Sequence, residues 1–316
     1  MSLFDAFRYD GKRVVVVGGA SGIGAAAAQL AQDAGAEVVV MDFAAVTLPG
    51  VKAIRLNLAE RASIDAAVDE CGGPVDALFS CAGVADGTAG IERINFVGHR
   101  HLIDRMLSKD MLRRGSAICF VSSLGGVGWE SSMGRLTELL DISDFDAAAR
   151  WFVDRGWANY TMTKQAIGAY VAREAFPFLK RGIRINAISP GATDTPLAQA
   201  NKETWLGFGT DYRDAAGIKP FTPTDQAYPM IFLCSDAAAA ITGTVVNSDA
   251  GWLSSAITKS FPNATFFAKV MLGRTVFTRL VRSLGMRLSG RAAAAAVRPG
   301  GLLQNLRAGR TAGKNP

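Results

Sequence analysis

Short apolar runs alternate with amphipathic stretches over the first 120 residues of the chain. Residues 14–17 form an unbroken β-branched run, which is typical of a strand buried on both faces of a parallel sheet. An alanine-rich stretch from residue 25 to about 34 follows, and Gly35 ends this predicted helix. The pattern then continues with predicted strands at 37–41, 53–56, 77–80 and 117–121, a helix at 62–70, and a further helix that contains Asn95.

This alternation predicts an α/β fold of the Rossmann type, with a doubly wound parallel sheet and right-handed crossovers. Ligands of such sheets bind at the carboxyl ends of the strands. The polar and glycine-rich segments of the chain fall at those ends, and they include the glycine turn at 18–24, Asp42, the segment 81–83 and Ser123.

The first strand runs directly into the turn Gly18-Gly19-Ala20-Ser21-Gly22-Ile23-Gly24 and then into the alanine-rich helix. Glycines let the backbone approach a pyrophosphate, and the helix N-terminus faces the anion, so the segment predicts a dinucleotide cradle. Asp42 ends the second strand, eighteen residues beyond Gly24. A carboxylate there accepts hydrogen bonds from the ribose hydroxyls and repels a 2′-phosphate, and no arginine flanks it, which favours NAD over NADP. The alternative is an ordinary turn residue.

Tyr160 and Lys164 stand one helical turn apart, with Ser122 and Ser123 upstream. On a helix their side chains project side by side. A phenol titrates near ~10 in isolation, and a neighbouring positive charge favours the phenolate, so the pair can move a proton at neutral pH. A serine hydroxyl aimed at the same oxygen would complete a site for an alcohol or a carbonyl. The alternative for an isolated pair of this kind is a solvated helix face.

The chain has 316 residues, and 49% of them are hydrophobic, which is typical of a globular protein with a substantial core. The four cysteines, Cys71, Cys81, Cys119 and Cys234, are widely spaced without a C-x-x-C pair, and the first residues lack the apolar core of a secretion signal. We therefore expect reduced thiols and a cytoplasmic location. No stretch reaches the ~18 unbroken apolar residues of a membrane span.

The net charge of +6 conceals an acidic body and a basic tail. From residue 257 onward there are eleven Lys or Arg and no Asp or Glu, which leaves 23 basic against 28 acidic residues, a net of −5, in the rest. The tail predicts an amphipathic basic helix over 264–288 and a flexible end over 291–316. It would lie on anionic lipid as a peripheral contact, or pack on the acidic body or a partner subunit. Nucleic acid is not expected, because a recognition motif is lacking. The apolar face of the predicted helix comprises Phe266, Val270, Phe277, Leu284 and Leu288.

Taken together, the motifs resemble those of the short-chain dehydrogenase/reductase family over about residues 10 to 253. The resemblance rests on several segments in the family's order. They are Gly18-x-x-x-Gly22-Ile23-Gly24, Ser80-Cys81-Ala82-Gly83, Asn95, Ser123 with Tyr160 and Lys164, Ile188-Ser189-Pro190-Gly191-Ala192-Thr193-Asp194-Thr195, Gly243 and Asp249-Ala250-Gly251.

The resemblance implies a role for each of these positions. Tyr160 would be the general acid and base, and Ser123 would hold the substrate oxygen. Lys164 would bind the nicotinamide ribose and lower the tyrosine pKa, and Asn95 would support a water in the proton relay. Asn57 stands where the family has an aspartate near adenine, and its amide carbonyl can still accept from the adenine amino group. The implied NAD-binding residues are Gly18, Ser21, Gly22, Ile23, Gly24, Asp42, Asn57, Leu58, Cys81, Ala82, Gly83, Tyr160, Lys164, Pro190, Gly191, Thr193 and Thr195, the two threonines orienting the carboxamide.

Two segments need separate interpretation: an insertion into the family pattern, and the segment at the position of the family's substrate lid. Ser123 and Tyr160 are thirty-seven residues apart, which implies an insertion at about 128–155 with helices predicted at 135–140 and 145–153. A similar insertion marks a subgroup with bacterial 3α-hydroxysteroid dehydrogenase/carbonyl reductases and coniferyl-alcohol dehydrogenases; here it would either change the dimer surface or wall the pocket. The segment 197–223 stands where the family keeps its substrate lid, and its aromatic residues would either contact a bulky apolar substrate or pack the loop down.

Two smaller features carry alternatives as well. Cys81 replaces an asparagine, and it is either a small packing residue or a redox-sensitive thiol. His99 and His101 form an H-x-H on the helix after Asn95; that spacing points them to different faces, so no metal site is predicted.

The sequence therefore predicts an NAD-dependent oxidoreductase domain over 1–256 and a basic extension over 257–316. The expected substrate is a small molecule, an apolar alcohol or ketone with a bulky skeleton such as that of a hydroxysteroid; coniferyl, cinnamyl-type or terpene alcohols are the alternative. A different class of function is a non-catalytic NAD-binding scaffold or sensor at a membrane. The resemblance also implies a homodimer or homotetramer.

Overall fold

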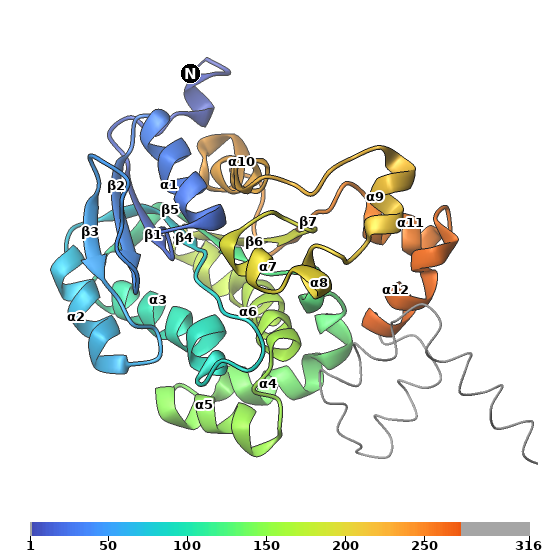
Figure 1. Ribbon diagram of the computed structural model, residues 1–316. Helices are drawn as coiled ribbons and strands as arrows, with labels where there is room; N and C mark the ends of the chain where they lie inside the picture. The colour runs from blue at the N-terminus through green and yellow to red at the C-terminus, as the bar shows by residue number, and fades with distance from the viewer. Residues whose placement is uncertain (1, 273–316) are drawn as a thin grey trace, which may run out of the picture.

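A seven-stranded parallel sheet forms the centre of the molecule in the computed structural model, which describes residues 2–272 (Figure 1). Every neighbouring pair is parallel, and the order is β3-β2-β1-β4-β5-β6-β7, so the direction of winding reverses between β1 and β4. This confirms the predicted doubly wound fold. The strands are β1 (Arg13–Val17), β2 (Glu37–Asp42), β3 (Lys52–Arg55), β4 (Val75–Ser80), β5 (Leu112–Val121), β6 (Arg184–Pro190) and β7 (Val245–Ser248).

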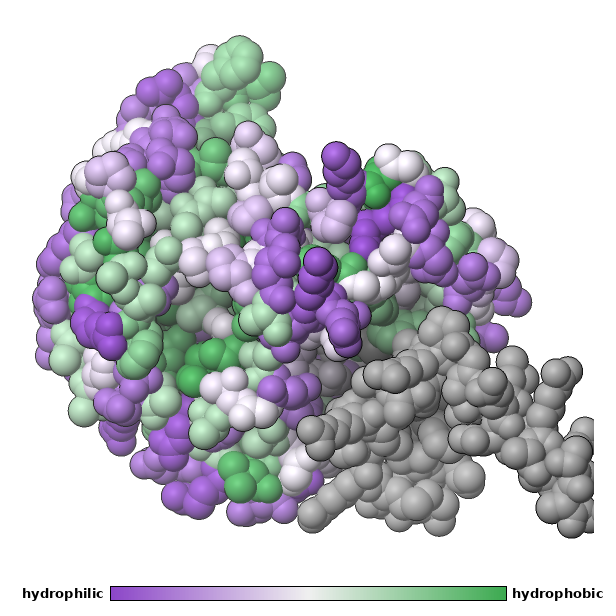
Figure 2. Space-filling model, viewed as in Figure 1, coloured by the Kyte–Doolittle hydropathy of each residue, from purple (hydrophilic) through white to green (hydrophobic). Residues whose placement is uncertain are grey.

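Helices cover both faces of the sheet (Figure 1). Val14 and Val16 of β1 pack with α1 and α10, whereas Val15 and Val17 pack with α2, α3 and α6, which explains why the first strand is apolar at every position. Figure 2 shows hydrophobic surface inside a hollow on the viewed face, bordered by hydrophilic residues. The helices are α1 (Gly22–Asp33), α2 (Arg61–Cys71), α3 (Gly98–Ser108), α4 (Met133–Asp141), α5 (Phe145–Asp154), α6 (Tyr160–Lys180), α7 (Pro196–Ala200), α8 (Lys202–Trp205), α9 (Thr210–Ala216), α10 (Pro223–Cys234), α11 (Trp252–Thr258) and α12 (Thr265–Met271).

Two predicted boundaries differ from the observed ones by three residues or more, and the others among the described residues by at most two. Helix α1 begins at Gly22, three residues before the predicted start, because the first turn of a helix tolerates glycine where its N–H groups need no intrahelical partner. Strand β5 begins at Leu112, five residues before the predicted strand. Its early residues 113–115 are exposed, so they lack the apolar pattern on which the prediction rested.

The insertion folds into α4 and α5 and packs on the outer side of α6. Leu136 and Leu139 are fully buried, and Trp129 lies against Gly168 so closely that a Cβ there would sit 2.6 Å from the indole ring. The buried Arg100 of α3 donates to the Leu139 carbonyl at 3.2 Å and to the Ile142 carbonyl at 2.7 Å, at the C-terminus of α4. Residues 128–155 line no part of the main cavity. The alternative in which the insertion walls the pocket is therefore wrong, and its effect on a dimer surface stays a prediction.

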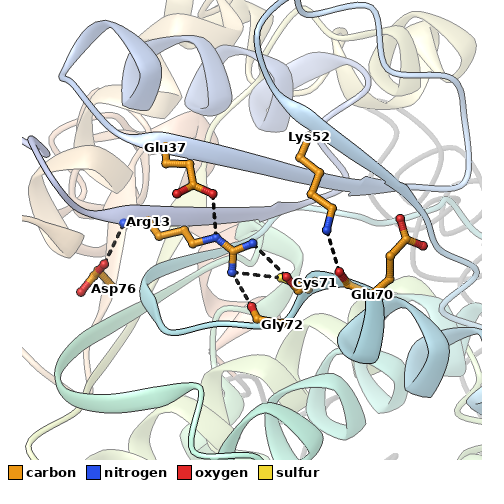
Figure 3. A network of polar contacts seen from close by, with 7 residues as sticks. All are labelled: Arg13, Glu37, Lys52, Glu70, Cys71, Gly72 and Asp76. Carbon is orange, nitrogen blue, oxygen red and sulfur yellow. Dashed lines mark hydrogen bonds and ion pairs between the residues drawn. The ribbon is translucent and has the colours of Figure 1, made fainter.

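Arg13 joins several elements at the amino edge of the sheet, opposite the strand ends that carry the motifs (Figure 3). Its guanidinium donates to the Cys71 carbonyl at 2.9 Å and also to the Gly72 carbonyl at the end of α2, and it pairs with Glu37 at 3.0 Å. Its backbone N–H donates to Asp76 at 2.7 Å. The Arg13 side chain therefore caps α2 and connects β1 to β2, and the backbone N–H of Arg13 connects β1 to the start of β4.

The beginning of the basic extension returns to the body. Ala264 and Ala268 are buried in a cluster with Trp252, and Phe267 packs against it. Phe266, which the sequence placed on the inward apolar face, is 53% exposed, so the inward face of α12 is one position away from the predicted one. Phe277, Leu284, Leu288 and the end at 291–316 lie outside the described residues. Within 2–272, none of the helices is both long enough and apolar enough to span a bilayer.

Candidate active site

A cavity of about 1100 Å³ opens at the carboxyl ends of the strands. Its walls come from the ends of β1, β2, β4, β5 and β6 and from the segment 192–208 that follows β6. All seventeen predicted NAD-binding residues line it. A single continuous space therefore contains the cofactor residues, Ser123, Tyr160 and Lys164, and it is large enough for a cofactor together with a substrate.

The glycine turn fits a pyrophosphate. Gly18 has φ +84°, and a Cβ there would lie 2.4 Å from the Ala82 nitrogen, while a Cβ on Gly24 would lie 2.0 Å from the Gly18 carbonyl oxygen. Side chains are thus excluded where the backbone must come close to a ligand. Ser21, the N-cap of α1, makes no side-chain capping bond, so the helix N-terminus faces the cavity. These residues suit a dinucleotide.

Asp42 is held in place by backbone donors. One carboxylate oxygen accepts from the Ala20 N–H at 2.9 Å and the other from the Ala44 N–H at 2.8 Å. No arginine flanks Asp42 in sequence, but the sheet register places Arg55 of β3 opposite it, with the guanidinium stacked 4.1 Å from the centre of the Phe43 ring. An arginine is therefore nearer to this carboxylate than the sequence indicated.

Asn57 already uses its amide within the chain. Its carbonyl oxygen accepts from the Ala59 N–H at 3.0 Å, and its nitrogen donates to Glu60 at 2.8 Å. The oxygen keeps one lone pair for the expected adenine contact.

Tyr160 and Lys164 lie on adjacent turns at the start of α6. Asn159 caps the helix by accepting from the Met162 N–H at 2.9 Å. The Lys164 ammonium donates to the Val121 carbonyl at 2.8 Å and lies 5.6 Å from the centre of the Tyr160 ring. The Ser123 side chain forms a hydrogen bond with the phenol. The three groups that the sequence singled out thus meet at one point of the cavity.

Burial has the largest effect on the pKa values of Tyr160 and Lys164. It raises the pKa of Tyr160 to about 12; the bond with Ser123 opposes this shift, and the nearby Asp86 carboxylate adds to it. Burial also lowers the pKa of Lys164 to about 8. The expectation that Lys164 brings the phenol toward neutrality is therefore wrong for the protein alone. The Lys164 ammonium is itself desolvated and donates to the Val121 carbonyl. The free-energy cost of burying a phenolate is larger than the stabilisation that this ammonium gives it.

Asn95 supports the site from beneath and does not line the cavity. It lies in a single π-helical turn, Arg93–Val97. Its carbonyl oxygen accepts from the Val84 N–H at 2.7 Å, and its nitrogen donates to the Val84 carbonyl at 3.0 Å and to the Thr163 hydroxyl at 3.3 Å. The side chain thus ties the loop after β4 to α6. Its role toward a relay water stays a prediction.

The predicted nicotinamide segment is arranged by its own side chains. The Thr193 hydroxyl donates to the Gly191 carbonyl at 2.9 Å, and Thr195 caps α7 by accepting from the Ala198 N–H at 3.1 Å. Cys81 lies at the cavity wall, and burial raises the pKa of its thiol, which favours the packing interpretation over a reactive thiolate.

The two histidines have separate partners. His99 contacts the Ala82 carbonyl at 3.0 Å, and burial lowers its pKa to about 4, whereas His101 pairs with Asp65 at 2.9 Å. Within residues 2–272 no cluster of three or more His, Cys, Asp or Glu has the arrangement of a metal site.

Asp86, Phe267 and Val270 are among the cavity residues that sequence reasoning missed. Asp86 accepts from the Tyr160 backbone N–H at 2.6 Å, although it lies in an irregular loop seventy-four residues away. Phe267 and Val270 of α12 line the cavity from beyond the segment that resembles the family. The position of Asp86 just after Ala82-Gly83 was a usable signal; the two α12 residues offered none.

Comparison with known proteins gives the same family from sequence and from structure. The model of the short chain dehydrogenase family matches residues 12–133, and that of the enoyl-(acyl carrier protein) reductases matches residues 143–253. A 2,5-dichloro-2,5-cyclohexadiene-1,4-diol dehydrogenase of Sphingobium indicum is 30% identical over 262 residues, which cover 78% of this chain and 98% of that protein. The coniferyl-alcohol dehydrogenase of Pseudomonas sp. strain HR199 is 29% identical over 248 residues, covering 76% and 96%.

Relatives named for steroids are similar as well. The 3-alpha-hydroxysteroid dehydrogenase/carbonyl reductase of Comamonas testosteroni is 26% identical over 254 residues, which cover 75% of this chain and 95% of that protein. The structure of the 3-alpha-hydroxysteroid dehydrogenase from Pseudomonas sp. B-0831 complexed with NADH superimposes with a TM-score of 0.62 at 25% identity, covering 79% of this chain and 99% of that one.

The chain belongs to the short-chain dehydrogenase/reductase family. It is accordingly an oxidoreductase of the class that acts on alcohols and carbonyls with a nicotinamide cofactor.

Proposed function

We propose that the protein is an NAD-dependent dehydrogenase that interconverts a secondary or aromatic alcohol and its carbonyl compound, on a bulky apolar substrate such as a hydroxysteroid. The observation that carries the proposal is the meeting of Ser123, Tyr160 and Lys164 in the cavity that the cofactor residues line. Relatives named for hydroxysteroids and for coniferyl alcohol support the choice of substrate.

The chain's own residues would manage the oxygen and its proton. Ser123 would hold the substrate oxygen beside the Tyr160 phenol, which takes the hydroxyl proton in oxidation and returns it in reduction. Lys164, fixed by Val121, would add positive charge beneath the ring and reach the nicotinamide ribose. When bound, the nicotinamide supplies or accepts the hydride.

The preference for NAD rests on Asp42. Its carboxylate is fixed by Ala20 and Ala44 at the end of β2, and it would repel a 2′-phosphate. Arg55 stacks on Phe43 and, in the described part of the chain, forms no ion pair with Asp42, so we expect the carboxylate to keep its repulsion. Asp42→Asn is expected to reduce the ratio of kcat/KM for NAD to that for NADP by at least tenfold, roughly the effect of one charge pair.

The test of the proposal is nicotinamide absorbance with purified protein, NAD or NADP, and hydroxysteroids, terpene alcohols and cinnamyl-type alcohols. Turnover with NAD that is lost in Tyr160→Phe is the expected result, because the variant keeps the ring and removes the proton donor. Equal turnover by wild type and Tyr160→Phe would contradict the proposal. Binding of NAD without turnover of any alcohol would favour a non-catalytic scaffold.

The expected oligomeric state, lipid contact and cellular location are further proposals. A homodimer or homotetramer would be seen by sedimentation equilibrium. Peripheral contact of 264–288 with anionic lipid would be seen as co-sedimentation with anionic vesicles that disappears when residues 258–316 are removed. A cytoplasmic location would be seen by fractionation.

A further inference from the structure

The start of the C-terminal extension forms one wall of the active-site cavity. Phe267 and Val270, both on α12, line the same space as Tyr160, although they follow it by more than one hundred residues. In Figure 1, α12 lies next to α11, away from the sheet. The inner part of the site, next to the strands, is therefore built by the family's motifs, and α12, which lies beyond the residues that the family models match, contributes to the outer part.

We propose that Phe267 and Val270 of α12 select the substrate by contacting its apolar part, and that they favour fused-ring or aryl alcohols over small ones. The inference rests on the proposed function and deepens it. It assigns the choice of substrate to the extension, whereas Ser123 and Tyr160 act on the oxygen.

An aromatic cluster fixes Phe267 against the lid segment that follows β6. The centre of its ring lies 4.7 Å from that of Phe208 and 5.4 Å from that of Trp252, and Phe208 and Trp252 are 4.7 Å apart. Such tilted, close pairs are favourable for aromatic rings. The lid therefore packs on the extension, and the two would move as one unit.

A second set of contacts holds the same two segments together. Tyr212 of α9 packs edge-on against Phe261 at 5.1 Å, and its hydroxyl donates to the Ala250 carbonyl at 2.9 Å. Ala264 and Ala268 bury the inner side of the extension. Because α12 is anchored in this way, Phe267 and Val270 present a fixed surface to the cavity.

The segment that follows β6 adds a further aromatic side chain to the cavity. Trp205 of α8 packs on the Tyr160 ring with 4.8 Å between centres. A substrate whose oxygen reaches Ser123 would leave its body among Trp205, Phe208, Phe267 and Val270, all of which line the cavity. Large flat apolar molecules fill a space of this kind, while a small alcohol would leave α12 without contact.

The experiment compares two alcohols and two ketones of different size. Phe267→Ala and Val270→Ala are assayed with NAD on 1-(2-naphthyl)ethanol and on cyclohexanol, and binding of 2-acetonaphthone and cyclohexanone is followed by tryptophan fluorescence. Phe266→Ala is the matched control, since its ring is adjacent in sequence but points outward and is 53% exposed. Phe267→Leu restores apolar bulk and separates lost contact from a folding defect, which circular dichroism would also detect.

We expect kcat/KM for the naphthyl alcohol to fall about tenfold or more in Phe267→Ala, with cyclohexanol within about twofold, since a truncated apolar pocket discriminates on that scale. KM for NAD should not change, Phe266→Ala should match wild type, and Phe267→Leu should recover most of the loss. Equal losses on both alcohols, or none, would overturn the inference. If wild type oxidises no alcohol, the proposed function fails, and the inference is decided by whether Phe267→Ala weakens binding of 2-acetonaphthone but not of cyclohexanone.

Discussion

The Asp86 carboxylate accepts a hydrogen bond of 2.6 Å from the backbone N–H of Tyr160, the first residue of the helix that carries the active-site pair. This places a negative charge at the N-terminus of a 21-residue helix, where it interacts favourably with the helix dipole. The same charge raises the pKa of the phenol. Asp86 therefore positions Tyr160 and adds to the rise in the phenol pKa that burial causes.

Replacing Asp86 with Asn is expected to shift the pH profile of alcohol oxidation toward lower pH. Oxidation needs the phenolate, and removing the negative charge lowers the pKa of Tyr160, while the amide oxygen can still accept from the Tyr160 N–H. The profile of kcat against pH for wild type and Asp86→Asn checks this. Asp33→Asn on α1, the same charge change far from Tyr160, is the control. An unshifted profile in Asp86→Asn would contradict the assignment.

Lys164→Met should abolish turnover and yet stabilise the protein when cofactor is absent. Burial lowers the pKa of Lys164 from 10.5 to about 8, so protonating it at pH 7 costs the folded state free energy. We expect a gain of about 1–3 kcal/mol at pH 7, after loss of the bond to Val121.

The pH dependence of the free energy of unfolding tests this cost of burying Lys164. Between pH 8 and 10.5 the unfolded chain binds more protons at this lysine than the folded one, so wild-type stability rises with pH over that range. Urea unfolding at pH 7 and pH 9.5 should show that rise in wild type and less of it in Lys164→Met. The exposed Lys109→Met should keep the rise. A variant less stable than wild type at both pH values would show that the bond to Val121 outweighs the burial cost.

Gly168→Ala should loosen the insertion from α6. A Cβ there would sit 2.6–3.0 Å from atoms of the Trp129 indole, so the ring must move, at a cost of about 1–3 kcal/mol. The matched control is Gly134→Ala in α4, which has open space around its Cβ and should gain about 0.5–1 kcal/mol. Tm values of both variants and tryptophan fluorescence would measure this. Equal effects of the two changes would mean that the Trp129 contact is not tight in solution.

Arg13→Met should lower stability by about 1–3 kcal/mol with kcat unchanged, because two carbonyls at the end of α2 lose their donor. Its pairing with Glu37 contributes little, since that carboxylate is 70% exposed. Arg8→Met removes an exposed ion pair with Asp10 and should leave the free energy of unfolding nearly unchanged. Urea unfolding of the three proteins separates the effects, and a drop in kcat for Arg13→Met would contradict a purely structural role.

The fold and most of the site could be predicted because their signals are local in the sequence. Val14 to Val17 are apolar at each position, since both faces of β1 are covered, and the glycine turn and Asp42 follow strand ends that parallel pairing brings to one edge. Tyr160 and Lys164 are related by one helical turn. Local spacing, read together with the order of the motifs, was sufficient for these residues.

Contacts between irregular or late segments could not be predicted in this way. The bond from Tyr160 to Asp86 depends on the path of a loop, and the inward turn of Phe267 in place of Phe266 depends on how α12 meets Trp252. The direction of the Tyr160 pKa shift depends on desolvation, which a sequence does not display. Each of these features depends on tertiary structure and leaves no periodic pattern in the sequence.

The wall formed by Phe267 and Val270 has a consequence for biosynthesis. A ribosome delivers the glycine turn first, Tyr160 about halfway along the chain, and α12 more than one hundred residues later. The nucleotide cradle can thus be complete while the outer side of the cavity is still missing. A nascent or prematurely terminated chain would be able to hold a dinucleotide before it could discriminate among alcohols.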